Sequence, residues 1–186
     1  MNKHIRFAGA ALVLALAAIT LMNPRPALAA NAAVIDSEVD AALKNLYETT
    51  PAAKVLGAKA KGILVFPNVV KAGFLVGAQY GDGALRKQGR TVGYYNIAAA
   101  SYGLQAGVQA FAYAMFFMTD AALKHLKREE GFEIGVGPSI VLVDTGMAKT
   151  LTTTTARDDV YAFVFAQEGL MAGVGLQGSK ITEIHP

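Results

Sequence analysis

The sequence has no cysteine and no tryptophan, and only three histidines in 186 residues. The absence of cysteine excludes disulfides, a cysteine nucleophile, cysteine-ligated metals and a lipidated N-terminal cysteine. His125 and His185, the two histidines beyond the N-terminal segment, stand too far apart in the sequence for a recognised ligand motif. No nucleophile and base are spaced as in a catalytic motif. We therefore expect a protein without enzymatic activity, metal or cofactor.

The first 29 residues have the order of a secretory signal peptide. Lys3 and Arg6 precede an uncharged run over 7–22, and Ala27-Leu28-Ala29 has the small-x-small pattern of a signal-peptidase site. We expect export to the periplasm with cleavage after Ala29. An uncleaved membrane anchor is the alternative, although the run is short for a span of about 20 residues.

The excess of positive charge belongs to this N-terminal segment. Three of the 17 Lys and Arg residues lie in it, which leaves 14 against 14 Asp and Glu. A formally neutral domain is not expected to bind nucleic acid, so an anionic partner must be met by a local basic patch.

Helical and extended patterns divide the rest of the chain. Apolar spacing predicts a helix over 34–47, and Pro51 favours a second short helix over 52–56. Asp120 is expected to cap a helix over 121–128. Short apolar runs between glycines predict strands, with a turn at 81–83. These strands are expected over 62–66, 73–80, 91–97, 103–116, 132–136, 140–143, 150–155 and 160–165.

Residues 91–119 carry no charge and are long enough for a transmembrane helix. Apolar residues at every even position from 104 to 116 favour strands instead. Glycine pairs four residues apart recur at 73/77, 103/107 and 169/173. Because such pairs leave bare patches on one face of a strand, they predict a bent sheet.

Basic residues form the only remaining candidate site, and solvated surface charge is the plain alternative for each of them. One group precedes or follows the first strand, a second surrounds a turn, and a third has helical spacing. Near an anionic surface each such residue contributes about 1 kcal/mol. The candidate lipid-binding residues are Lys59, Lys61, Lys71, Arg86, Lys87, Arg90, Lys124, Lys127 and Arg128, with Tyr94 and Tyr95 as interfacial aromatics.

From residue 58 onward the sequence resembles the SYLF lipid-binding domain family, in its bacterial exported branch. The resemblance is carried by KGILVFP at 61–67, KAGFLVG at 71–77, GDG at 81–83, GLQAG at 103–107, GVGP at 135–138, VYAF at 160–163, GLMAGV at 169–174 and LQG at 176–178. It implies an α+β fold in which a curved, barrel-like antiparallel sheet is packed with N-terminal helices and one short internal helix.

The resemblance also implies a non-enzymatic domain that binds anionic lipid. We divide the chain into a signal peptide (1–29), an N-terminal helical segment (30–57) and a SYLF-like core (58–186). The expected function is peripheral binding of anionic phospholipid headgroups in the bacterial cell envelope. The alternative is an envelope structural or stress protein that binds a protein partner or itself, without lipid affinity. Actin, a partner of some eukaryotic relatives, is not expected for an exported bacterial protein.

Overall fold

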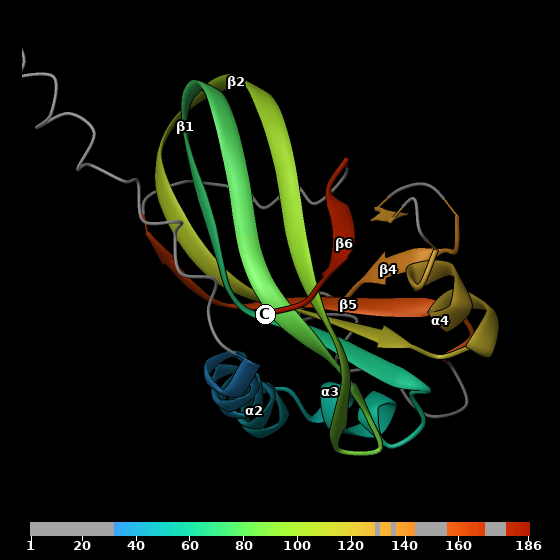
Figure 1. Ribbon diagram of the computed structural model, residues 1–186. Helices are drawn as coiled ribbons and strands as arrows, with labels where there is room; N and C mark the ends of the chain where they lie inside the picture. The colour runs from blue at the N-terminus through green and yellow to red at the C-terminus, as the bar shows by residue number, and fades with distance from the viewer. Residues whose placement is uncertain (1–31, 129–130, 135–136, 144–155, 170–177) are drawn as a thin grey trace, which may run out of the picture.

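The computed structural model describes residues 32–128, 131–134, 137–143, 156–169 and 178–186. The proposed signal peptide, the strand expected over 150–155 and the glycine at 173 lie outside these residues. Within them the fold is α+β, with three helices and a curled six-stranded sheet. The predicted fold class is therefore confirmed (Figure 1).

Both N-terminal helices form where the sequence predicts them. Helix α2 spans Ala32–Thr49 and buries Ile35, Val39 and Leu46, which lie on one side at helical spacing. Helix α3 spans Pro51–Gly57, with proline in its first turn, where a missing N–H costs nothing.

One long antiparallel hairpin makes up most of the sheet. Strand β1 spans Gly62–Lys87 and pairs along its length with β2, Arg90–Phe117. The turn is Gln88-Gly89, where both residues have positive φ, 51° and 75°, as a two-residue type I′ turn requires. The turn predicted at 81–83 is wrong, because those residues pair with 95–97 inside the hairpin. The helix considered over 91–119 is also wrong, since 91–117 lie in β2.

The hairpin is bent back on itself near its middle (Figure 1). Gly73 pairs with Gly107, and the register shifts between Gly73 and Leu75. A Cβ on Gly73 would lie 2.5 Å from the Cα of Gly77, and one on Gly83 would overlap the carbonyl of Val65. The glycines therefore let the two halves of β1 touch, which confirms the predicted bent sheet.

Short strands extend both halves of β2. Strand β5 (Val160–Gly169) pairs with residues 109–117, and β6 (Lys180–Ile184) pairs with 94–98. Strand β3 (Phe132–Glu133) lies beside β6. Strand β4 (Ile140–Leu142) runs parallel to β5, which corrects the expectation of a wholly antiparallel sheet.

Apolar side chains pack on both faces of the sheet. One cluster fills the inside of the curl and includes Leu64, Phe111 and Phe117. The other lies between the outer face and helices α2 and α3, and includes Phe116 and Phe163. Helix α4 (Asp120–Leu126) closes one end of the inner cluster with Ala122, Leu123 and Leu126. Across the described part of the chain, no helix has both the length and the apolar character needed to span a bilayer.

Candidate functional site

Helix α4 and the hairpin turn form an open cleft with three lysines on it. Lys87 comes from the end of β1, and Lys124 and Lys127 come from α4 and the residue after it. The cleft has a volume of about 300 Å³ and is also lined by Asp120 and Leu123. We call Lys87, Lys124 and Lys127 the basic cleft.

Packing fixes the position of this cleft. Leu123 is buried, and its Cδ1 lies 3.0 Å from where a Cβ on Gly62 would stand. The first turn of α4 is capped by Thr119, whose side-chain oxygen accepts a hydrogen bond from the Ala122 N–H at 3.2 Å. Thr119 itself donates to Asp159 Oδ1 at 2.9 Å. The cap predicted at Asp120 is therefore wrong by one residue, because Thr119 has the extended backbone that a cap needs.

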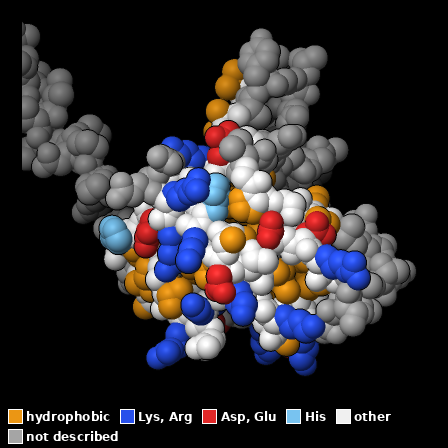
Figure 2. Space-filling model, turned by 90° about the vertical axis from the view of Figure 1, so that its right-hand side faces the viewer, with side chains coloured by type: hydrophobic (Ala, Val, Ile, Leu, Met, Phe, Trp, Pro, Cys, Tyr) orange, Lys and Arg blue, Asp and Glu red, His pale blue; other side chains and the backbone are white. Residues whose placement is uncertain are grey.

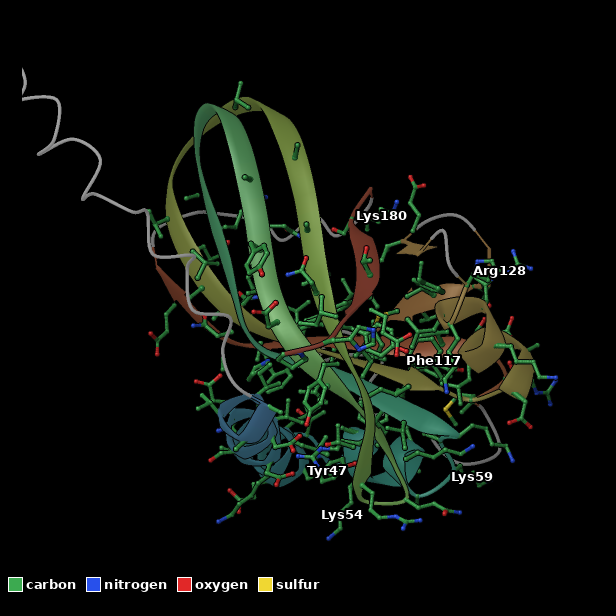
Figure 3. The ribbon with its side chains drawn as sticks, in the orientation of Figure 1. Tyr47, Lys54, Lys59, Phe117, Arg128 and Lys180 are labelled. Carbon is green, nitrogen blue, oxygen red and sulfur yellow. The ribbon has the colours of Figure 1, made fainter. Side chains whose placement is uncertain are left out.

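Further cations stand near this end of the molecule. Arg90 is the cross-strand partner of Lys87. The backbone N–H of Lys61 donates to the carbonyl of Phe117, and Phe117 lies three residues before the start of α4. Lys59 and Arg128 are also exposed. Figure 2 views the molecule from the side on which Figure 1 draws α4, and Lys and Arg side chains gather along its lower part. In Figure 3, Arg128 and Lys59 both lie on this side of the molecule, well apart from each other.

Arg86 is not part of that exposed set. Its side chain is 10% exposed and donates from Nη2 to Asp40 Oδ1 at 2.7 Å and to the Asp36 carbonyl at 2.9 Å. The same Nη2 lies 3.6 Å from Asp36 Oδ1. Arg86 therefore ties β1 to α2, and its burial removes it from the candidate lipid contacts.

The two candidate tyrosines are also engaged within the fold. Tyr94 donates its hydroxyl to Asp36 Oδ2 at 3.1 Å, and Thr91 donates to Asp36 Oδ1 at 2.6 Å. Tyr95 is 1% exposed, which removes it from the interfacial aromatics. Burial, and to a smaller extent Glu183, raises the pKa of Tyr95 to about 12.

Lys71 lies inside the curl, not in a loop after Pro67. Strand β1 continues through a register shift between Phe66 and Val69, and Lys71 is 6% exposed. A proline is tolerated at such an irregularity because no ladder hydrogen bond is needed there. Lys71 therefore belongs to no surface patch.

Sequence reasoning missed two polar features of the structure. Asp36 accepts hydrogen bonds from Thr91 and Tyr94 at its carboxylate and from Arg86 at its backbone carbonyl. In the sequence it is an ordinary acidic residue at the start of a helix. Gln79, Gln109 and Ser179 are buried inside the curl. The position of Gln109 in a strand of alternating apolar residues was the only signal for them. No cluster of three potential metal ligands occurs among the described residues.

A comparison with known families finds one match, in the C-terminal part of the chain. Residues 98–185 match the family model described as Ysc84: Las17-binding protein actin regulator, which is the SYLF family. The matched segment contains most of β2, all of α4 and strands β3 to β6, and its similarity to this family agrees with the resemblance found in the sequence motifs. No curated protein matches the chain.

Proposed function

We propose that the protein binds anionic phospholipid at a membrane surface through the basic cleft, without catalysing a reaction. The observation that carries this proposal is the convergence of Lys87, Lys124 and Lys127 on one open cleft from two separate elements. Cations that share one surface attract the same anionic headgroups. Each cation contributes about 1 kcal/mol to the binding free energy. The similarity of residues 98–185 to a family associated with lipid or actin-regulator binding supports the same function.

The balance of charge also determines how the binding depends on salt. Beyond the proposed signal peptide the chain is formally neutral, so its attraction to anionic lipid is local. A local electrostatic attraction at an exposed cleft is screened over about 8–10 Å at physiological salt. Binding is therefore weak, selective for anionic vesicles and sensitive to salt.

The proposed place of action is the bacterial cell envelope. The order of residues in 1–29 supports export, removal of this segment after Ala29 and peripheral association with a membrane in the periplasm. Mass spectrometry of the exported chain tests this directly. A mature N-terminus at Ala30 supports export, whereas an intact N-terminus in the cytoplasmic fraction contradicts it.

Flotation with liposomes tests the proposed activity. The exported chain is mixed with neutral phosphatidylcholine vesicles and with vesicles that contain phosphatidylglycerol, at low and at high salt. Binding to the anionic vesicles alone, lost at high salt, supports the proposal. Absence of binding to either vesicle contradicts it and favours the alternative of an envelope protein that binds a protein partner or itself, which the molar mass in solution then examines.

A further inference from the structure

A layer of polar side chains lies inside the curled hairpin, between the apolar core and the bend. Lys71, Gln79 and Gln109 are each at most 6% exposed, and Ser179, the residue before β6, is fully buried. We call these four residues the inner polar site. It is separate from the basic cleft, because it lies on the inner face of the sheet and shares no residue with the cleft.

The fold-back of β1 brings these residues together. A Cβ on Gly81 would lie 3.1 Å from the Cα of Val69, and a Cβ on Gly73 would lie 2.5 Å from the Cα of Gly77. Lys71 lies midway between Val69 and Gly73, and Gln79 lies midway between Gly77 and Gly81. The two side chains are therefore placed opposite each other on the two halves of β1.

Two further residues complete the cluster. Gln109 is the direct cross-strand partner of Lys71, so the two side chains leave neighbouring strands on the same face. Gln79 Nε2 donates to Ser179 Oγ at 2.8 Å. Because the Ser179 oxygen accepts that bond, its own proton is available for a further acceptor.

Within the described residues the polar groups of this cluster are not satisfied. Lys71 makes no ion pair with any described carboxylate, and the Oε1 of Gln109 has no hydrogen-bond partner there. A buried amide oxygen without a donor is unfavourable, and a lysine that is only 6% exposed gains from an anion beside it. The cluster therefore offers a positive charge beside a free acceptor on one half of the hairpin, and a hydroxyl donor on the half opposite.

We propose that the inner polar site binds a phosphate ester that carries a free hydroxyl group. The Lys71 ammonium and the Ser179 hydroxyl donate to the phosphate oxygens, and the hydroxyl of the ligand donates to Gln109 Oε1. A soluble phosphate ester and a phosphoglycerol lipid headgroup share this chemistry. If the source is a lipid, the inference rests on the proposed function and adds an inner site for the headgroup.

Calorimetric titration of the exported chain with glycerol 3-phosphate tests the site. We expect saturable binding to the wild type and at least a tenfold loss of affinity in Lys71→Met. Lys54→Met, a matched change at an exposed lysine of α3 that belongs neither to this site nor to the basic cleft, is expected to keep the wild-type affinity. Equal affinity in Lys71→Met and the wild type would overturn the assignment, as would no binding to the wild type.

Two further measurements separate ligand binding from a structural role. Gln109→Leu is expected to reduce the preference for glycerol 3-phosphate over ethyl phosphate, which lacks the free hydroxyl; an unchanged preference would overturn the hydroxyl contact. Without ligand, Lys71→Met is expected to unfold at the same or a higher urea concentration, because it replaces a mostly buried lysine that pairs with no described carboxylate by an apolar side chain of similar size. Unfolding at a clearly lower concentration would assign Lys71 a structural role.

Phosphatidylglycerol vesicles then distinguish the sources. If glycerol 3-phosphate binds and competes with the vesicles, the headgroup is the source; if it binds without competing, a soluble ester is. Failure of vesicle binding contradicts the proposed function alone, whereas failure of glycerol 3-phosphate binding contradicts the inner polar site alone.

Discussion

Replacing Arg86 with methionine should loosen the contact between α2 and the hairpin. The guanidinium is buried and binds Asp40, the Asp36 carbonyl and, at 3.6 Å, the Asp36 carboxylate. Removing one partner of a buried ion pair typically costs about 3–5 kcal/mol, because the other charge is left without compensation.

Solvent and other donors reduce that cost here. The Asp40 side chain is 72% exposed, so water replaces its lost partner. Asp36 keeps the hydrogen bonds from Thr91 and Tyr94. The Nε of Arg86 has no partner, so its removal costs nothing. We therefore expect Arg86→Met to lower the free energy of unfolding by about 2–3 kcal/mol, below the usual range for a fully buried pair.

Urea unfolding followed by far-ultraviolet circular dichroism measures this loss, since the chain has no tryptophan for fluorescence. Lys87→Met is the matched control, because Lys87 is the next residue and is exposed. Its free energy of unfolding should change by less than about 0.5 kcal/mol. A loss below about 1 kcal/mol in Arg86→Met, or an equal loss in both variants, would refute the reasoning.

Two further predictions concern the interior. Unfolded tyrosine ionises near pH 10, whereas burial raises the pKa of Tyr95 to about 12, so the stability from this group is present below pH 10 and is lost as the pH rises towards 12. Tyr95→Phe should flatten the fall in stability across that window in urea unfolding at several pH values; an unchanged slope would contradict the cause. Gly83→Ala should lower the free energy of unfolding by about 3 kcal/mol or more, because its Cβ would overlap the Val65 carbonyl, whereas Ala78→Ser at an exposed position should cost less than about 0.5 kcal/mol. Similar urea midpoints for these two variants would argue against the close contact within β1.

Local sequence signals were sufficient for the helices. Apolar spacing in 34–47 and Pro51 predict α2 and α3 because both signals act within one or two turns. The alternation over 104–116 likewise distinguishes a strand from a membrane helix, since side-chain period is a local property.

The turn of the hairpin was not predictable from glycine content alone. Gly81 and Gly83 look like turn residues, but their role is close approach between the two halves of β1. The actual turn places Gln88 at positive φ, which a residue other than glycine, asparagine or aspartate seldom signals. Whether the turn lies at 81–83 or at 88–89 is decided by the pairing register of the 26 residues of β1 against β2. A local sequence pattern carries no information about that register.

The candidate site was only partly predictable for the same reason. Lys124 and Lys127 have helical spacing, so their shared side follows from the sequence, but their approach to Lys87 depends on how α4 packs over Gly62. The burial of Lys71 and Arg86 depends on the fold-back of β1 and on the docking of α2. Both are long-range contacts, and residue type alone favours exposure for lysine and arginine.

The central claim is that the basic cleft makes the contact with anionic lipid, and a pair of matched triple variants tests it most directly. One variant carries Lys87→Gln, Lys124→Gln and Lys127→Gln. The other carries the same change at three exposed lysines elsewhere, Lys44, Lys54 and Lys180. Both remove three positive charges, so the net charge is equal and only the location differs.

The partition coefficient of each variant onto phosphatidylglycerol-containing vesicles is measured at low salt. At about 1 kcal/mol per lysine, the cleft variant should bind roughly 100-fold more weakly than the wild type. The control variant should stay within a few-fold of the wild type. An equal loss in both variants would mean that net charge, and not the basic cleft, determines binding, and undiminished binding of the cleft variant would contradict the account.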